Sequence, residues 1–444
     1  MKTPDLKWPR IAVVGSGISG LATAHGLKEH AQITLFEAGD YFGGHTHTVD
    51  VTLPDAEGRP VTHGVDTGFL VFNQKTYPGL IRLFEALGVT IAASDMSFSV
   101  QVPHAFGSRS LEWNGADLNT VFAQRANLLR PRFWRLLRDI LRFNRLATEL
   151  ALNDADESLM LPLQDFLRQQ GFGQIFQDWY LLPMLGCIWS CPTDQMLRFP
   201  VATMVRFCHN HGLIQVNGRP QWLTVQGGAK HYVDKILAGL SDTRLHTPVT
   251  RVERDEQGVW IHTPHGSERF DEVVLATHSD QALRLLAQPT RAEQEVLGAI
   301  GYHPNRAVLH TDTSVMPRSA RAWAAWNYER PVRTTETGQH VCLHYWLNRL
   351  QPLPFRDPVF VSLNPLRPIR PDCVLQTFEY DHPVFDLGAI RAQARMPDLQ
   401  GTDRIWFAGA WMGYGFHEDG LRAGQSVVRQ WLARHANSPV GGLA

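Results

Sequence analysis

Three glycines and an acid near the start of the chain have the spacing of a phosphate-binding turn. The apolar run at residues 11–14 leads into Gly15-x-Gly17-x-x-Gly20, and Glu37 closes the next apolar stretch. Small residues let backbone N–H groups approach a pyrophosphate, and a helix beginning at Ile18 directs its positive end at that charge. We therefore predict a dinucleotide site formed by Gly15, Ser16, Gly17, Ile18, Ser19, Gly20, Glu37 and Ala38, with Glu37 holding the ribose hydroxyls.

Tyr380 and His382 are side chains that can donate protons near a pocket. Both precede Pro383, so we expect them in a loop or at a strand end. They act there either as catalytic proton donors or in ordinary structural hydrogen bonds.

Histidine is frequent, with 20 residues, but its spacing does not indicate a metal centre. The pairs His45-x-His47 and His209-x-His211 bring alternate side chains together only on a strand. Neither pair has carboxylates or cysteines at the spacing of metal ligands, so we predict no metal site.

Length and composition restrict the class of protein. A chain of 444 residues predicts two domains, and a formal net charge of −1 argues against a nucleic-acid partner. The five cysteines form no CxxC pair, which predicts buried thiols in a reducing compartment. Lys2, Lys7 and Arg10 precede an apolar stretch, as in a secretory signal, but the glycine turn gives that stretch another role. No later segment reaches the roughly 18 apolar residues that span a bilayer, so we expect a cytoplasmic protein that is soluble or peripheral on the inner membrane face.

Two further parts of the chain are arranged to meet a nucleotide. Residues 247–277 alternate apolar and polar side chains around turns at 256–258 and 264–266, which predicts a β-meander returning to a buried strand. Residues 405–408 form a strand that runs into Gly409, Gly413 and Gly415 and then into an amphipathic helix. A second helix N-terminus is thus expected at the cofactor.

Three segments of the chain resemble the amine-oxidase-like flavoproteins. The matching motifs are GGHTHTVD after Glu37, VDTGFLVFN at Val65–Asn73 and GYGFHEDGLRAG near the end. The resemblance implies that FAD is bound noncovalently by Gly43, Gly44, His45, Thr67, Gly68, Phe69, Val249, Ala276, Gly409, Phe416, His417 and Glu418, in addition to the glycine turn. It implies that a protonated His417 stabilises negative charge on the reduced flavin.

The same resemblance implies an α/β fold with a discontinuous Rossmann-like FAD-binding domain and an inserted substrate domain of mixed sheet and helices. We assign residues 1–75, 215–285 and 396–436 to the first domain. Residues 76–214 and 286–395 form the second, and residues 437–444 form a flexible tail.

Some residues depart from the family pattern. His45 stands where many relatives have arginine, and Ala410 stands where many have a carboxylate that binds the ribityl chain. No cysteine follows Cys373, so a C-terminal thioether to the flavin cannot form. No lysine follows Lys235, whereas amine oxidases of this family typically hold a lysine near flavin N5. The absence of this lysine favours carbon–carbon dehydrogenation or isomerisation over amine oxidation.

The expected substrate domain offers apolar walls and a basic helix. We expect one helix over residues 119–150, with Leu129, Phe133, Leu136, Leu137, Ile140 and Leu141 on one face and Arg135, Arg138, Arg142 and Arg145 on another. That arginine face either is simply solvated or contacts anionic lipid headgroups. The aromatic segments 177–192, 322–328 and 341–347 favour an apolar pocket.

The motifs together resemble a bacterial branch of the superfamily that includes the flavin-dependent fatty-acyl desaturase of furan fatty acid biosynthesis. This implies dehydrogenation of a methylated or unsaturated acyl chain by hydride transfer to flavin N5, with an apolar acyl-lipid substrate and a lipid methyltransferase as a partner. A redox-neutral fatty-acid isomerase or hydratase, a soluble amine oxidase that releases hydrogen peroxide, and a non-enzymatic flavin-stabilised scaffold are the alternatives.

Overall fold

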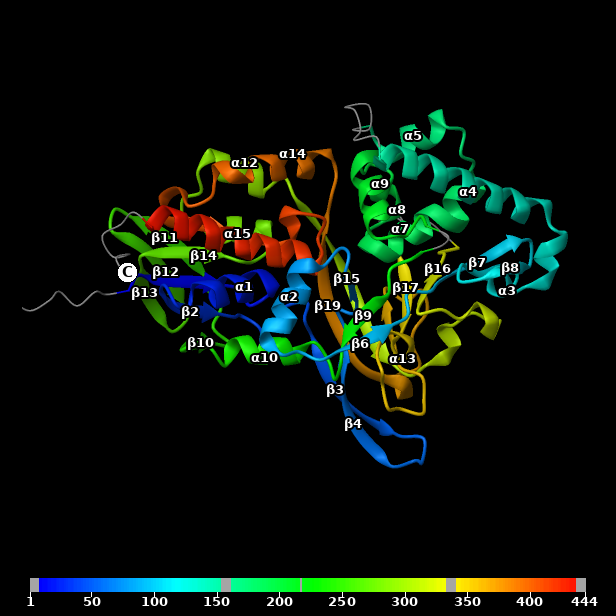
Figure 1. Ribbon diagram of the computed structural model, residues 1–444, viewed down its shortest axis with the longest axis horizontal. Coiled ribbons are helices and arrows are strands. Elements are labelled where there is room, and N and C mark those ends of the chain that lie inside the picture. The colour runs from blue at the N-terminus through cyan, green and yellow to red at the C-terminus, as the bar shows by residue number, and fades with distance from the viewer. Residues whose placement is uncertain (1–7, 153–160, 216–217, 333–340, 437–444) are drawn as a thin grey trace, which may run out of the picture.

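The computed structural model describes residues 8–152, 161–215, 218–332 and 341–436. The predicted flexible tail, Lys2 and Lys7 therefore lie outside the described residues. A parallel sheet with its helices occupies one end of the molecule, and a larger sheet covered by helices occupies the other (Figure 1). The α/β fold expected from the sequence is confirmed, while the domain boundaries stay a prediction.

A five-stranded parallel sheet forms the core of the first half. Its order is β10-β2-β1-β14-β20, with strands at Asp242–Arg244, Gln32–Phe36, Arg10–Val14, Glu272–Leu275 and Ile405–Phe407. The apolar run after Arg10 is buried on both faces, as central parallel strands require. The carboxyl ends of β1 and β14 lie side by side, so the residues that follow them meet at one edge of the sheet.

Two helices from opposite ends of the sequence pack together on this sheet. The helix expected from Ile18 is α1 (Ile18–Leu27), and α15 (His417–His435) lies against it (Figure 1). A Cβ at Gly424 would come within 2.4 Å of the carbonyl oxygen of Ser19. Glycine at this position therefore allows the two backbones to approach.

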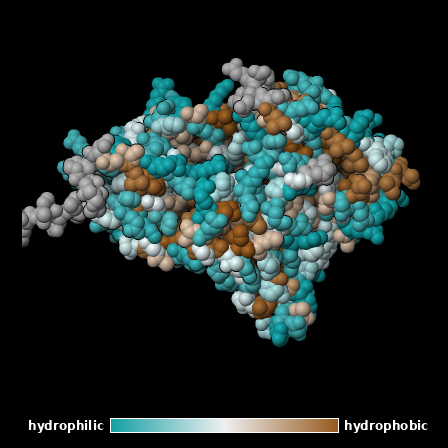
Figure 2. All heavy atoms as spheres, in the orientation of Figure 1, coloured by the Kyte–Doolittle hydropathy of each residue, from teal (hydrophilic) through white to brown (hydrophobic). Residues whose placement is uncertain are grey.

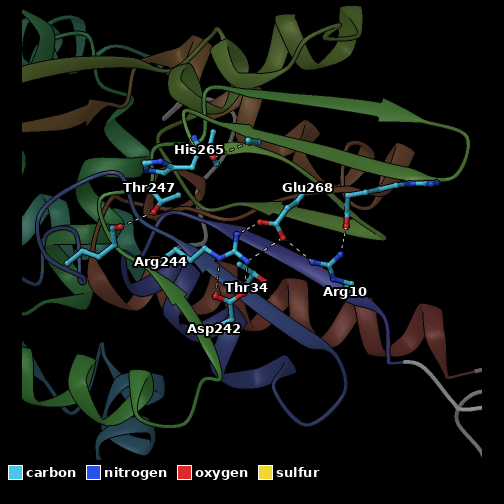
Figure 3. Close-up of polar contacts among 11 residues, drawn as sticks. Arg10, Thr34, Asp242, Arg244, Thr247, His265 and Glu268 are labelled. Atoms are coloured by element: carbon cyan, nitrogen blue, oxygen red, sulfur yellow. Dashed lines mark hydrogen bonds and ion pairs between the residues drawn. The ribbon is translucent and has the colours of Figure 1, made fainter.

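The predicted β-meander is confirmed. It consists of β11 (Arg251–Asp255), β12 (Gly258–Thr263) and β13 (Gly266–Phe270), and it leads into β14. Figure 3 shows Arg244 of β10 between Asp242 and Glu268 of β13. Arg10 also pairs with Glu268 at 3.2 Å. These ion pairs connect the meander to the parallel sheet.

A seven-stranded sheet forms the second half, in the order β19-β15-β18-β17-β16-β7-β8. Its strands span Val374–Val384, Gly301–His310, Phe360–Leu363, Cys342–Trp346, Trp326–Glu329, Phe98–Phe106 and Arg109–Asn114. Tyr380 and His382 lie within β19 and not in a loop. Pro383 is tolerated in this strand because β19 is the edge strand.

Helices cover the second sheet. They are α3 (Leu118–Val121), η1 (Arg125–Leu129), α4 (Pro131–Leu152), α5 (Leu163–Gln169), α6 (Gln174–Phe176), η3 (Gln177–Leu181), α7 (Leu182–Trp189), α8 (Thr193–Met196) and α9 (Val201–Asn210). The expectation of one helix over residues 119–150 was wrong, because the long helix begins only at Pro131, where proline is favoured. Leu129 and Leu141 are exposed and do not join the buried face.

Short elements join the two halves. A hairpin of β3 (Thr48–Pro54) and β4 (Pro60–Asp66) projects from the molecule (Figure 1). A small sheet contains β5 (Phe72–Asn73), β9 (Trp222–Val225) and β6 (Ile91–Ser94). The remaining helices are α2 (Pro78–Leu87), α10 (Lys230–Leu237), α11 (Ser279–Leu285), α12 (Arg291–Leu297), α13 (Leu347–Leu350) and α14 (Leu387–Arg395), with 3-10 turns at 313–315, 320–322, 371–373, 396–398, 402–404 and 410–412.

All five cysteines are free and buried, as predicted. Within the described part of the chain, no helix has both the length and the apolar character needed to cross a membrane.

Candidate active site

A cavity of about 720 Å³ runs from the carboxyl edge of the parallel sheet to the seven-stranded sheet and its helices. Most of the residues predicted to bind the cofactor line it: Gly15, Ser16, Gly17, Ile18, Ser19, Glu37, Ala38, Gly44, His45, Thr67, Gly68, Phe69, Val249, Ala276, Gly409, Phe416 and His417. Gly20, Gly43 and Glu418 do not line it. The candidate proton donors Tyr380 and His382 also line the cavity.

The three glycines of the turn have different roles. Gly15 has a φ of +101°, and a Cβ there would lie 2.6 Å from the carbonyl oxygen of Ala276. A Cβ at Gly20 would lie 1.9 Å from the carbonyl oxygen of Gly15. At Gly17, by contrast, a Cβ would meet nothing within 4 Å, although this residue lines the cavity. Gly15 and Gly20 thus serve the packing of the chain, and Gly17 leaves space for a ligand.

The N-terminus of α1 faces this space. Gly17 is its N-cap and provides no side-chain hydrogen bond to the first turn. The N–H groups of the first turn and the helix dipole are therefore available to an anion at the cavity wall. This arrangement suits a pyrophosphate.

Glu37 holds the turn from the end of β2. Its carboxylate accepts hydrogen bonds from the backbone N–H of Ser16 at 3.0 Å and of Gly39 at 2.8 Å, and from the Ser16 hydroxyl. The Ser16 hydroxyl oxygen in turn accepts from the N–H of Gly43 at 3.0 Å. Gly43 thus stabilises the turn through its hydrogen bond to Ser16. Glu37 also lines the cavity, where a ribose is expected.

His45 brings an unpartnered polar atom to the cavity. The side chain is partly buried, but its Nε2 is inaccessible to solvent and has no hydrogen-bond partner among the residues that the structure describes. Burial is the main cause that lowers the pKa of His45 well below its usual value, so the ring is neutral. The rings of Tyr380 and His382 lie 5.1 and 5.3 Å away. A buried polar atom that lacks a partner beside a cavity is what a missing polar ligand leaves behind.

The segment after β4 is fixed against the loop that carries His45. The N–H of Phe69 donates to the carbonyl oxygen of His45 at 2.8 Å, and the N–H of Thr67 donates to that of His47 at 2.9 Å. A Cβ at Gly68 would lie 2.4 Å from the carbonyl oxygen of His45. Glycine at position 68 is therefore needed for this close approach.

His417 begins α15 and is stacked on Phe69, with ring centroids 3.7 Å apart. Its Nε2 lies 2.9 Å from the hydroxyls of both Thr46 and Tyr232. Burial lowers the pKa of His417 to about 3, so the imidazole is neutral at physiological pH. The protonation that we predict for His417 concerns the reduced flavin, whose negative charge would raise this pKa, so it stays a prediction.

Tyr380 and His382 have partners of their own. The Tyr380 hydroxyl lies 2.8 Å from the Thr67 hydroxyl and 3.0 Å from His47 Nδ1. The side-chain amide of Asn305 lies 3.3 Å from His382 Nδ1. Burial lowers the pKa of His382 to about 4 and raises that of Tyr380. Both side chains are neutral at physiological pH, and their catalytic role stays a prediction.

Glu418 points away from the cavity. Its two carboxylate oxygens accept hydrogen bonds from the N–H groups of Gly79 and Leu80, each at 2.9 Å. These N–H groups belong to the first turn of α2, whose N-cap Tyr77 provides no side-chain cap. In this structure Glu418 caps α2, a role that its position in the motif did not indicate.

The far end of the cavity is apolar. Its walls come from α7, α9, β9 and the seven-stranded sheet, and include Ile188, Trp189, Phe207, Leu213, Trp222, Trp326, Tyr345 and Leu363. The aromatic segments noted in the sequence supply Trp189, Trp326 and Tyr345. The charged side chains among the described lining residues are Glu37, Arg284 and Asp381. Arg284 and Asp381 both act on the pKa of His278 next to β14, so they lie beside the parallel sheet and not at the apolar end.

His211 is a polar group at this apolar end. It follows α9, stacks on Phe207 at 3.9 Å, and places Nδ1 3.0 Å from the Phe207 carbonyl oxygen. A carbonyl only accepts, so Nδ1 carries the hydrogen and Nε2 keeps its lone pair. Burial lowers the pKa of His211 to about 4. Sequence reasoning considered His211 only as half of the pair His209-x-His211, which it rejected as a metal site.

One cluster outside the cavity has the residue types of a metal site, namely Glu329, Cys342 and His344. The N–H of Asp312 donates to His310 Nδ1 at 3.0 Å, so His310 donates through Nε2 to Ser362 at 2.7 Å. Ser362 can then donate to His344 Nδ1 at 2.7 Å, and His344 Nε2 to Glu329 at 3.3 Å. This buried hydrogen-bond chain is satisfied without an ion, and the absence of a metal site stays a prediction.

Comparison with known proteins adds the family. The model of the flavin-containing amine oxidoreductases matches residues 18–366. The chain belongs to this family. FAD is accordingly the cofactor of this oxidoreductase, and the features described above fit it: a cavity-facing glycine, an uncapped helix N-terminus and a histidine whose buried Nε2 is unpartnered.

Individual relatives are more distant. Probable polyamine oxidase 4 of Arabidopsis thaliana is 29% identical over 276 residues, which cover 60% of this chain and 50% of that protein. The match thus spans about half the length of this curated relative. The crystal structure of a CLA-producing fatty acid isomerase from P. acnes has a TM-score of 0.65 at 16% identity, covering 95% of this chain and 98% of that one. Cyclohexylamine oxidase from Brevibacterium oxydans has a TM-score of 0.66 at 16% identity, covering 96% and 99%. These two structures share the fold of the oxidoreductase.

Proposed function

We propose that this FAD-dependent oxidoreductase removes two hydrogens from an apolar acyl chain and so forms a carbon–carbon double bond. The observation that carries the proposal is the apolar end of the cavity. Apart from His211 and the phenol of Tyr345, its walls are indole, phenyl and aliphatic side chains, and the charged lining residues lie elsewhere. An ammonium substrate buried there would have no charged partner, which is costly, whereas an acyl chain gains from the transfer.

The absence of lysine after Lys235 supports the same choice of substrate. Members of the family that oxidise amines typically use a lysine beside the flavin, and no lysine is among the described residues that line the cavity. A methylated or unsaturated chain is the substrate class that we favour, because an allylic hydrogen is more readily removed.

The reaction needs acceptors for a hydride and for a proton. When bound, noncovalently in our proposal, FAD supplies the two-electron acceptor that takes the hydride. The second hydrogen leaves as a proton, and His211 is placed to accept it because its Nε2 lone pair is free of the intrahelical hydrogen bond. His211 is neutral at physiological pH, as a proton acceptor must be. In this scheme Tyr380, His382 and His417 line the cavity and do not take the substrate proton.

A methylated chain must be made before it is oxidised. A lipid methyltransferase is therefore the partner that we propose for the preceding reaction.

Anaerobic reduction of the bound flavin tests the proposal. We expect holoenzyme mixed with methylated cis-monoenoic phospholipid to lose its flavin absorbance, with one double bond formed for each flavin reduced. His211→Phe should slow bleaching by about 100-fold or more, the usual range for a lost general base. His209→Phe is the matched control, because it removes a histidine in the last turn of α9, two residues before His211, that does not line the cavity.

Other outcomes identify other functions. Bleaching by spermidine or putrescine with peroxide release in air, and none with any acyl lipid, would contradict the proposal and identify an amine oxidase. The structural neighbour that isomerises fatty acids gives a second candidate, since it has the same fold. Double-bond migration without net flavin reduction would identify an isomerase.

A further inference from the structure

A cluster of exposed apolar side chains lies at one end of the molecule. Six of the twelve large apolar side chains that are exposed in the described chain fall within residues 118–152. Four of them form what we call the tip patch: Leu118, Leu128, Leu129 and Trp134, with exposed fractions of 77%, 46%, 88% and 50%. Figure 2 shows hydrophobic residues gathered at this end, where η1 and the start of α4 lie in Figure 1.

Hydrogen bonds and ring contacts hold the tip patch together. The indole N–H of Trp134 donates to the carbonyl oxygen of Leu128 at 2.9 Å. The Trp134 ring lies 5.4 Å from that of Phe122, whose N–H donates to the carbonyl oxygen of Leu118. The four side chains are therefore presented as one surface.

Arginines follow the tip patch along α4. Residues 118–152 contain seven arginines against two acids, a formal charge of +5 in a chain whose total is −1. Arg135, Arg138, Arg142 and Arg145 are all exposed on α4. Within the described residues, Arg132, Arg135 and Arg145 make no hydrogen bond or ion pair. The cations are thus available to an external anionic surface.

The tip patch is separate from the active site. No residue between 118 and 152 lines the cavity, so the exposed leucines do not serve as part of its entrance. Apolar side chains exposed to this degree in one place indicate an interaction surface.

We propose that the tip patch docks on the surface of a bilayer that contains anionic phospholipids. Leucine and tryptophan side chains enter the boundary between headgroups and acyl chains, and the arginines of α4 contact the headgroup phosphates. The combination of a protruding apolar turn with a local excess of positive charge favours this occupant. Docking does not depend on the proposed reaction.

Vesicle flotation of the FAD-loaded enzyme tests the docking. We expect it to float with vesicles of phosphatidylcholine and phosphatidylglycerol, and much less with phosphatidylcholine alone or at high salt. Arg132→Glu with Arg135→Glu should weaken the partition coefficient by at least about 25-fold, from roughly five-fold per arginine near the surface. Leu129→Ser should weaken it by about ten-fold.

Two matched variants serve as controls. Arg429→Glu changes an exposed arginine of α15, and Val332→Ser changes an apolar side chain that is 65% exposed elsewhere. Both should leave flotation within two-fold of the wild type. Flavin content and thermal unfolding of each variant show that the fold is intact.

The result that would overturn the docking is a wild type that stays unbound with anionic vesicles at low salt. Equal losses in the tip-patch variants and the controls would also overturn it. Either outcome would leave the tip patch as a contact for a protein. Bleaching by acyl lipid dispersed in detergent should be unchanged in the tip-patch variants, so docking and reaction are tested separately.

Discussion

Replacing Glu418 distinguishes a cofactor contact from a structural cap. The motif that contains this residue predicts a contact with FAD, whereas in the structure its carboxylate accepts hydrogen bonds from the N–H groups of Gly79 and Leu80. Glu418 is 4% exposed. Arg422, one turn later in α15, reaches one of its oxygens at 3.2 Å.

The expected loss of stability follows from these contacts. A hydrogen bond to a charged group contributes about 1.5–3 kcal/mol, and a buried donor left without a partner costs about 1–3 kcal/mol. Glu418→Ala leaves two such donors at the start of α2 and opens a small void, so we expect the free energy of unfolding to fall by about 3–5 kcal/mol. Glu418→Gln keeps one acceptor oxygen and should cost about half as much.

Urea unfolding of the FAD-free protein, followed by FAD titration, provides the measurement. Glu149→Ala is the control, because it removes an exposed carboxylate from α4 and should change stability by less than about 0.5 kcal/mol. The reasoning would be refuted if Glu418→Ala left the stability of the FAD-free protein unchanged and weakened FAD binding ten-fold or more. That result would place the carboxylate on the cofactor.

Two further predictions concern the glycine turn and the response to acid. Gly17→Ala should leave the FAD-free protein as stable as the wild type and weaken FAD binding by at least ten-fold, because its Cβ enters only open space at the cavity. Gly20→Ala should instead unfold at a lower urea concentration, because its Cβ meets the carbonyl oxygen of Gly15 at 1.9 Å. Urea midpoints and FAD titrations separate the two, and equal effects on both quantities would contradict the assignment. The free energy of unfolding should also fall as pH drops from about 6.5 towards 4. A histidine whose pKa is lower in the folded state than in the unfolded state stabilises the fold above its unfolded pKa. It loses that contribution as pH falls towards its folded pKa. The buried histidines concerned have a pKa of about 3 or 4: His211, His310, His382 and His417. Carboxyls with a raised pKa oppose this trend, namely Asp66 and Asp419. We therefore compare how steeply the free energy of unfolding falls with decreasing pH in the wild type and in His211→Phe. The variant should reduce this slope by up to about 1.4 kcal/mol per pH unit. An unchanged slope would show that His211 is not held neutral by burial.

Local patterns predicted the elements that depend on adjacent residues. The turn at Gly15, the helix from Ile18 and the meander at residues 251–270 all appear where the sequence placed them. Each is determined by contiguous backbone conformation and by alternation of side chains along one strand.

Apolar periodicity predicted a longer helix at residues 119–150 than the structure contains. The pattern that predicted one helix back to residue 119 is interrupted by separate turns, and the helix begins at Pro131. Leu129 therefore belongs to a protruding turn and is 88% exposed. The apolar surface that we propose to meet a membrane arises from this break.

Some side chains of the candidate site had no sequence signal of their own. Thr46 and Tyr232 meet at His417, although residues 46 and 417 are 371 positions apart. His211 reaches the apolar end of the cavity only because α9 packs there. Such contacts depend on how separate segments pack, which no local pattern records.

The sequence by itself determined how this protein holds a dinucleotide, because that task falls to backbone groups of short contiguous segments whose glycines are visible in the chain. Tertiary structure alone decided which side chains wall the apolar end and which way Glu418 points. It also decided that His417 is buried, which lowers its pKa. These properties depend on burial and on partners from distant segments, and burial is a property of the packed molecule.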